Sequence, residues 1–325
     1  MRIRHISSLL GIALVLAACG DAEWKTIIGS DGYTSAAPEN VRIYYRSVGS
    51  GDDVVVAPFA TLLGTSLDSL AKGRRVVTYD PRGRGRSDSV PPDRVSLDLL
   101  LQDLDLVLRT VNRERRTGSV TLIGWSGGGM ETFVYAMRNR GKVDRLVQLA
   151  PVAPQLDPYG AMMMDDRQRR TDSAALAGLR ARRTAGVYAD RPEAYCRAED
   201  SVTAPPLFAN PAQRPPTPDV CAYPNEYPAN LSVYFGALFQ SIQGFNYTDS
   251  LSRVSIPRLV IHGEKDNTPL EGNEKWILGQ PNARLLVIPN AGHWPHYEQP
   301  ALTLRAIEAF LQGQWPEGSV EKPKP

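Results

Sequence analysis

The residues Gly124-Trp125-Ser126-Gly127-Gly128 place one serine between small residues at the end of an apolar run. The strand-like stretch 119–123 precedes them, and the helix-compatible stretch 130–137 follows. A strand, a sharp turn and a helix in this order project a single hydroxyl from a sheet edge, and glycine tolerates so tight a turn. The pattern predicts that Ser126 is a nucleophile, with a plain glycine-rich connection as the alternative. Trp125, next to it, is a candidate substrate-binding residue.

A serine hydroxyl becomes a good nucleophile when a base removes its proton. The chain has four histidines, of which His5 lies near the N-terminus. His293 follows Ala291-Gly292 on a loop just after the last strand-like segment, so it can reach back over the sheet edge. His296 is the competing base, whereas His262 ends a strand-like run and is expected to pack or cap. We therefore predict that His293 is the base.

The base needs an acid that fixes its tautomer and stabilises the imidazolium. Asp266 lies in the turn after the strand-like run 258–261 and precedes His293 in the chain. Turns that follow parallel strands meet at one sheet edge, so Asp266 is expected at the same edge as Ser126. Glu264 is the nearest rival. Together these positions predict a serine–histidine–aspartate triad.

A carbonyl oxygen that gains negative charge during nucleophilic attack needs N–H donors already in place. One predicted donor is the backbone N–H of Gly127. The second is expected in the turn after the strand-like run 54–56, within Ala57-Pro58-Phe59-Ala60. Pro58 has no N–H, so Phe59 is the predicted donor.

Strand-like and helix-like segments alternate along two parts of the chain. Short apolar runs that are each followed by a helix indicate a parallel sheet covered on both faces. The predicted strands are 41–46, 54–56, 75–79, 119–125, 143–149, 258–261 and 284–288, and the predicted helices are 97–111, 130–137, 272–278 and 301–311.

The alternation stops at Pro151 and resumes near residue 251. The stretch between contains a basic helical piece (165–183), an irregular piece (191–228) and an aromatic helical piece (231–242). We predict an α/β core formed by residues 19–150 and 251–312, a lid formed by residues 151–250, and a disordered tail formed by residues 313–325.

The N-terminus has the pattern of an export signal. Arg2 and Arg4 precede a mostly apolar run, 6–18, that is too short to span a membrane comfortably. The sequence Leu16-Ala17-Ala18-Cys19 resembles the bacterial lipobox. This resemblance implies that residues 1–18 are removed, that Cys19 is lipidated, and that the protein is anchored in the bacterial cell envelope. An ordinary signal peptide is the alternative.

The charge balance and the cysteine positions bear on nucleic-acid binding, disulfide formation and metal binding. Without Arg2 and Arg4 the 37 basic residues become 35, equal to the 35 acidic ones, which argues against nucleic-acid binding. The arginines of the turn 80–87 are expected to be solvated. In an exported protein Cys196 and Cys221 are predicted to form a disulfide, with two free thiols as the alternative. Neither lies in a zinc-binding spacing, so no metal site is predicted.

Four segments together resemble the α/β-hydrolase superfamily over nearly the whole mature chain. They are Gly124–Gly128, Asp80–Ser87, His262–Asp266 and Gly292-His293 with Glu298 and Pro300 downstream. The resemblance implies an α/β-hydrolase fold without a cofactor, with an eight-stranded, mostly parallel sheet, helices on both faces and an inserted, mainly helical lid. Family members usually carry His-Gly after the third strand, where this chain has Ala57-Pro58. This departure leaves the expected fold unchanged, but the family pattern does not support the prediction of Phe59 as the second oxyanion donor.

Within the superfamily, the lid and the turn at 80–87 look most like the prolyl and tripeptidyl aminopeptidases. These enzymes use lid carboxylates to hold a free amino terminus, and Glu226, Glu193 and Glu199 are the possible counterparts here. The expected activity is therefore cleavage of an acyl bond, in an ester or a short peptide, with a slight preference for peptides. The alternatives are a carboxylesterase or lactonase, and a non-catalytic binding lipoprotein.

Overall fold

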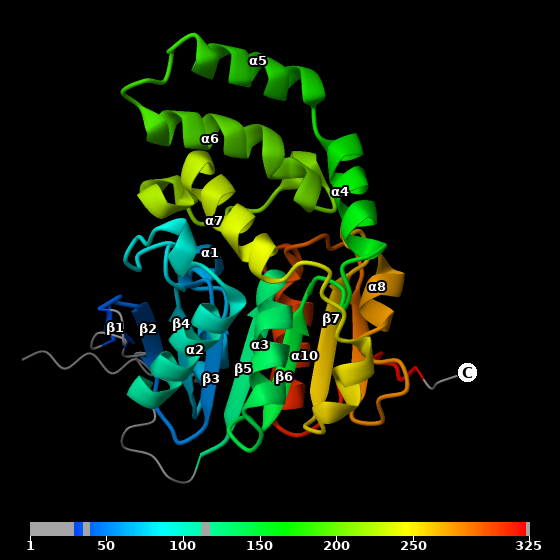
Figure 1. Cartoon of the computed structure of the whole chain (residues 1–325). Coiled ribbons are helices and arrows are strands. Elements are labelled where there is room, and N and C mark those ends of the chain that lie inside the picture. The colour runs from blue at the N-terminus through cyan, green and yellow to red at the C-terminus, as the bar shows by residue number, and fades with distance from the viewer. Residues whose placement is uncertain (1–28, 35–39, 112–117, 323–325) are drawn as a thin grey trace, which may run out of the picture.

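The computed structural model describes residues 29–34, 40–111 and 118–322. Its strands are β1 (Gly29–Tyr33), β2 (Tyr44–Gly49), β3 (Val54–Pro58), β4 (Arg75–Tyr79), β5 (Val120–Trp125), β6 (Arg145–Leu149), β7 (Arg258–Gly263) and β8 (Ala283–Ile288). They form one sheet in the order β1-β2-β4-β3-β5-β6-β7-β8 (Figure 1). Strand β2 pairs antiparallel with β1 and β4, and the other neighbours are parallel. The predicted eight-stranded, mostly parallel sheet is confirmed.

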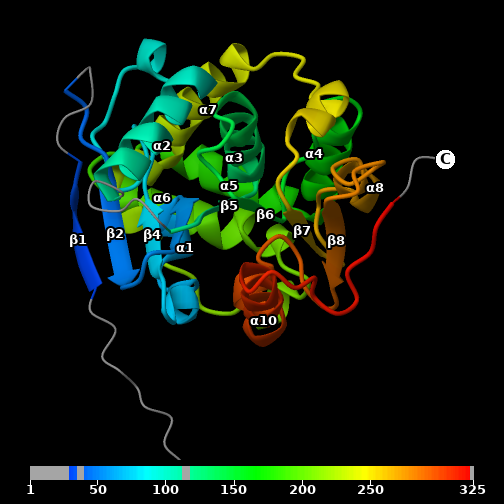
Figure 2. The ribbon, with the colours of Figure 1, turned by 90° about the horizontal axis from the view of Figure 1, so that it is seen from below.

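Helices cover both faces of the sheet, as seen from below in Figure 2. Helices α2 (Leu97–Val111) and α3 (Gly127–Arg138) lie on one face, and α1 (Ala60–Leu63) and α10 (Pro300–Leu311) lie on the other. Along β3, Val54 and Val56 pack into the first core, while Val55 packs into the second. Burial on both faces explains why the strands read as continuous apolar runs.

Strand β1 is not predicted by the sequence pattern. Its residues, GSDGY, include no β-branched side chain. The strand forms because its backbone pairs in register with β2 at the edge of the sheet. Helix α2, in contrast, has the predicted bounds, and the Oγ of Ser96 accepts a hydrogen bond from the N–H of Leu99 at its start.

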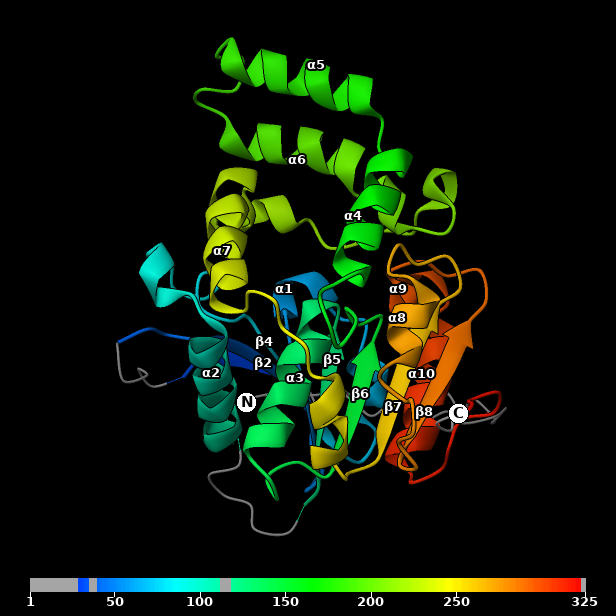
Figure 3. The same cartoon turned by 45° about the vertical axis from the view of Figure 1, so that its right-hand side comes forward.

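The predicted insertion forms four helices above the carboxyl ends of the parallel strands (Figure 3). They are α4 (Tyr159–Arg170), α5 (Ser173–Thr184), α6 (Pro192–Thr203) and α7 (Pro228–Ser241), with short 3-10 turns between α6 and α7. Helices α4 and α7 contact the core, and α5 and α6 lie further from it. No helix in the described ranges is long and apolar enough to cross a membrane.

Two predictions within the lid are wrong in detail. The basic piece 165–183 is two helices, because Asp172 caps α5 by accepting a hydrogen bond from the N–H of Ala175. The piece predicted as irregular contains α6, which starts with Pro192 at a position where no helix hydrogen bond is lost. The predicted disulfide is present: Cys196 of α6 is bonded to Cys221 in a 3-10 turn.

The prediction of a disordered tail is wrong for residues 313–322. The backbone of Val320 pairs with Leu285 of the edge strand β8. The ring of Trp315 packs against that of Phe310 at a tilt of 37°, with centroids 5.3 Å apart, and the guanidinium of Arg284 lies 5.0 Å from the Trp315 ring centroid. Backbone pairing at the sheet edge together with these ring contacts orders the segment. The predicted signal peptide 1–18 and Cys19 lie outside the described residues.

Candidate active site

Ser126 lies in the sharp turn between β5 and α3. Its backbone has φ 54° and ψ −124°, which is unusual for a residue with a side chain. The flanking glycines permit this turn: a Cβ on Gly124 would lie 2.1 Å from the carbonyl oxygen of Gly128, and one on Gly129 would lie 2.6 Å from the Cβ of Pro151. The turn leaves Ser126 half-buried at the carboxyl edge of the sheet.

The structure brings the three predicted residues of the triad together. The Nε2 atom of His293 lies 2.9 Å from the Oγ of Ser126. On the other side of the ring, Nδ1 lies 3.0 and 3.1 Å from the two carboxylate oxygens of Asp266. With the Nδ1 proton facing the carboxylate, Nε2 presents its lone pair to the serine hydroxyl. This is the geometry needed for proton removal during nucleophilic attack.

Asp266 is buried yet favours the charged state. Burial alone would raise its pKa, but the neighbouring His293 imidazole and the N–H of Thr268 lower the pKa below its ordinary value. An ionised Asp266 stabilises the imidazolium that forms when His293 takes the serine proton. The rival acid, Glu264, instead accepts a hydrogen bond from the N–H of Asn290.

Trp125 holds the loop that carries His293 in place. The indole N–H of Trp125 donates to the carbonyl oxygen of His293 at 2.8 Å, and its ring packs against Trp294 with centroids 4.1 Å apart. Trp125 is only 6% exposed. Its predicted role in substrate binding is therefore wrong, because the ring supports the His293 loop and does not face an open pocket.

Glu298 also fixes the loop that carries His293. Its carboxylate accepts hydrogen bonds from the backbone N–H groups of Gly292, Trp294 and Ala209. The N–H of His293 itself donates to the carbonyl oxygen of Leu207. Leu207 and Ala209 belong to the lid, so the position of the base depends on contacts from both parts of the fold.

The two predicted oxyanion donors have backbone geometry that suits this role. Gly127 is the first residue of α3, so its N–H has no carbonyl partner within the helix. Phe59 has φ 73° and ψ 51°, a left-handed conformation that is strained for a bulky residue and occurs mainly at functional sites. A Cβ on Gly128 would lie 3.1 Å from the Phe59 ring, which places the two turns in contact. Ala57-Pro58 end strand β3 and leave the fold intact.

The other two described histidines do not contact Ser126 or Asp266 by hydrogen bonds. His262 is buried, and its Nδ1 lies 2.8 Å from the side-chain nitrogen of Asn273, as expected for a packed residue. His296 is also buried, and burial lowers its pKa to about 3. It packs as a neutral ring against Trp294 and Tyr297.

Glu226 lines a pocket in the lid, but its carboxylate is bound by the core. Its Oε1 accepts hydrogen bonds from the Nε of Arg84 at 2.9 Å and from the N–H of Gly85 at 2.7 Å, while its Oε2 accepts from the second guanidinium nitrogen. Both oxygens of Glu226 therefore join the lid to the core, and its role in substrate binding stays a prediction. The hydrogen-bonding partner Arg84 was expected to be solvated, but it is buried.

The arginines of this turn could not have been placed from the sequence. Arg82 forms a buried ion pair with Asp103 of α2, and Arg84 pairs with the lid. The acids closest in sequence, Asp80 and Asp88, are not their ion-pair partners, which lie 21 and 142 positions further along the chain. Among the described residues no group of three histidine, cysteine or acidic side chains is placed to hold a metal ion.

Comparisons with known proteins agree with the architecture described above. A family model for the alpha/beta hydrolase fold matches residues 62–300. A protein of Synechocystis sp. named as a non-heme chloroperoxidase is 26% identical over 82% of this chain and 96% of its own. A proline iminopeptidase of Lactobacillus delbrueckii subsp. lactis is 26% identical over 85% of this chain and 96% of its own.

Among solved structures, a thermophilic esterase from Thermogutta terrifontis shares the fold. Its TM-score is 0.56 at 22% identity, over 87% of this chain and 98% of the esterase. The family model spans most of the chain and includes the serine turn, the acid and the base. The sheet order, the lid and the match to the family model lead to one conclusion: this chain is a member of the α/β-hydrolase family.

Proposed function

We propose that this protein is a serine hydrolase that cleaves a carboxylic ester through an acyl-enzyme on Ser126. The observation that carries the proposal is the continuous chain of hydrogen bonds from Ser126 through His293 to Asp266, with nitrogen–oxygen distances of 2.9 and 3.0 Å. Such a chain activates the hydroxyl for attack on a carbonyl carbon.

The reaction proceeds in two steps. The Oγ of Ser126 attacks the carbonyl carbon while Nε2 of His293 takes the serine proton, and the N–H groups of Gly127 and Phe59 stabilise the oxyanion. Collapse of this intermediate breaks the bond to the leaving group, which receives the proton from His293. Water, activated by the same histidine, then hydrolyses the acyl-enzyme and releases the carboxylic acid.

An ester is favoured over a peptide because of the lid chemistry. An aminopeptidase needs a carboxylate that is free to bind the substrate's ammonium group, and Glu226 is engaged by Arg84. Glu199 keeps peptide cleavage as the second candidate, since it lines a pocket in the lid. The similarity to a proline iminopeptidase supports the same candidate.

A lipid anchor at Cys19 is also proposed, on the basis of the sequence Leu16-Ala17-Ala18-Cys19. The disulfide between Cys196 and Cys221 supports an oxidising compartment such as the bacterial envelope. Metabolic labelling of cells with a fatty-acid analogue should tag the wild-type protein and not a Cys19→Ser variant. Equal labelling of both proteins would contradict the anchor.

The activity is tested with a fluorophosphonate probe and a substrate panel. The probe should label the wild-type protein, and Ser126→Ala should abolish the labelling without loss of the folded state. The panel compares 4-nitrophenyl esters with aminoacyl-arylamides, and faster turnover of the esters is expected. Turnover of the arylamides alone would identify an aminopeptidase. A folded protein that neither reacts with the probe nor turns over a substrate would be a binding protein instead.

A further inference from the structure

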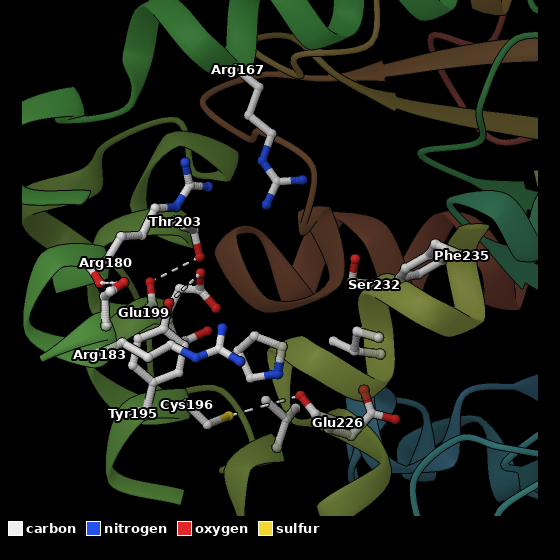
Figure 4. Close-up of a pocket in the computed structure, with 15 residues that line it drawn as sticks. Arg167, Arg180, Arg183, Tyr195, Cys196, Glu199, Thr203, Glu226, Ser232 and Phe235 are labelled. Atoms are coloured by element: carbon white, nitrogen blue, oxygen red, sulfur yellow. Dashed lines mark hydrogen bonds between the residues drawn. The ribbon is translucent and has the colours of Figure 1, made fainter. Parts of the chain in front are cut away.

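The lid carries an open pocket of about 770 Å³ that is lined by both polar and apolar side chains (Figure 4). Its walls come from all four lid helices. Arg167 belongs to α4, Arg180 and Arg183 to α5, Glu199 to α6 and Phe235 to α7. Three arginines thus line a volume large enough for a small organic molecule; Arg167 is partly buried, and Arg180 and Arg183 are exposed.

The α4 wall of the pocket begins beside the acid of the triad. The Oγ1 of Thr268 donates to the sulfur of Met163, on the core-facing turn of α4, at 3.7 Å. The N–H of Thr268 donates in turn to Asp266. Arg167 lies four residues after Met163, which is about one turn further along the helix. Arg167 therefore lies about one helical turn from a residue that contacts the loop of Asp266.

The α7 wall begins beside the second oxyanion donor. The guanidinium of Arg84 lies 5.3 Å from the ring centroid of Phe235, which lines the pocket, and 5.3 Å from that of Phe59. The lid pocket therefore extends between two elements that contact opposite sides of the serine site, one beside Asp266 and one beside Phe59.

Arg167 has no acidic partner within ion-pair distance in the part of the chain that the structure describes. The neighbouring arginines of α4 differ: Arg169 and Arg170 both pair with Asp166. Burial lowers the pKa of Arg167, and no nearby carboxylate raises it. In Figure 4 its side chain extends away from α4 toward the middle of the pocket. A partly buried cation without a counter-charge is a site prepared for an anion.

Of the three acids that line the same pocket, two are paired with arginines that do not line it. Glu226 pairs with Arg84 outside the pocket, and Asp200 pairs with Arg214 at 3.4 Å. Glu199 accepts a hydrogen bond from the hydroxyl of Tyr195 at 3.2 Å. These contacts leave the positive charge of the arginines in excess.

We propose that Arg167 binds a carboxylate of the substrate, located away from the scissile ester and inside the lid pocket. The proposal rests on the proposed hydrolase function and specifies its substrate class: a monoester of a dicarboxylic acid, or a related ester with one free carboxylate. A planar guanidinium binds a carboxylate through two parallel hydrogen bonds. A substrate with a free ammonium group would instead be repelled by the three arginines.

Binding is tested first in a variant that cannot turn over. In Ser126→Ala, adipate should raise the thermal unfolding temperature in a concentration-dependent way, whereas adipamide, its neutral counterpart, should not. The shift should disappear when Arg167→Gln is added and persist when Arg169→Gln is added, since Arg169 is exposed and paired. Inorganic phosphate is the third ligand. A shift with phosphate and none with adipate would overturn the carboxylate assignment, as would an adipate shift that survives Arg167→Gln.

Kinetics provide the second test. The wild-type enzyme should hydrolyse the 4-nitrophenyl monoester of adipic acid with a kcat/KM at least about tenfold above that of the corresponding adipamate ester, the value expected from one charged hydrogen-bonded contact. Arg167→Gln should remove this preference, and Arg167→Lys should restore part of it. Arg169→Gln is the matched control, and it should leave the kcat/KM of both esters and the fluorophosphonate labelling unchanged.

The two tests separate failure of the subsite from failure of the proposed function. Equal kcat/KM for the charged and neutral esters would refute the subsite while leaving the hydrolase intact. Adipate binding that depends on Arg167, in a protein without esterase activity, would retain the anion site and refute the hydrolase.

Discussion

Arg84 of the core and Glu226 of the lid form an ion pair at 2.8 Å, although 141 residues lie between them in the chain. Their side chains are only 5% and 2% exposed. Arg84 also lies against the rings of Phe59 and Tyr234. This one contact therefore connects the lid to the turn that carries the predicted oxyanion donor.

Arg84→Met should destabilise the protein by about 3–5 kcal/mol, because it leaves the carboxylate of Glu226 buried without a partner. The double variant with Glu226→Leu should recover most of this loss, since no charge then remains. Urea unfolding followed by circular dichroism measures both. Arg197→Met is the matched control: its pair with Asp219 is exposed and screened by solvent, so a much smaller change is expected. An equal loss in the two single variants would contradict the role of burial.

Trp125→Phe should lower kcat by roughly tenfold with little change in KM, because it removes the hydrogen bond to the carbonyl oxygen of His293 and lets the base shift. Steady-state kinetics on a 4-nitrophenyl ester measure both constants. Trp315→Phe, on the opposite side of the sheet from α3, is the control and should change neither. A selective rise in KM would show instead that the indole contacts substrate.

Glu131 makes stability fall as pH rises through neutrality. It belongs to α3 and is buried, and burial raises its pKa to about 8 despite a hydrogen bond from the hydroxyl of Tyr79. Between the unfolded value near 4.5 and about 8, the folded protein keeps a proton that the unfolded chain has released, so deprotonation favours unfolding over this interval.

Glu131→Gln should abolish that contribution, because a neutral amide can accept the same hydrogen bond at any pH. The free energy of unfolding of the wild type, relative to the variant, should fall between pH 5 and pH 8 and level off above. Chemical denaturation at several pH values provides the comparison. A difference that does not vary with pH would show that Glu131 does not change protonation on unfolding in this range.

Loss of the disulfide should destabilise the lid. Cys196 and Cys221 close a loop of 25 residues, and the chain-entropy model gives about 3 kcal/mol for a loop of this length. Replacement of both cysteines by serine should lower the unfolding temperature and expose residues near 196–226 to protease before the core. Limited proteolysis followed by mass spectrometry locates the cuts. If the core were cut first and the lid were cut no faster than in the wild type, the disulfide would have no role in stabilising the lid.

The sequence determined the catalytic centre because its signals are local. Ser126 requires small neighbours in a tight turn, and Asp266 and His293 each follow an apolar strand of a parallel sheet. Such strands end at one edge, so the order of the elements along the chain was sufficient to bring the three side chains together. The helix 97–111 was predicted for a similar reason, since its apolar period and its cap both lie within the segment.

Only the tertiary structure decided what surrounds that centre. In the structure Trp125 supports the loop of His293, and Glu226 pairs with Arg84. Both depend on contacts between segments more than 100 residues apart, which leave no periodic pattern in either segment. The unpaired Arg167 has the same origin, because whether a charge is satisfied depends on every helix packed around it. Local spacing can specify a turn, whereas the partner of a buried charge is set by the packing of the whole fold.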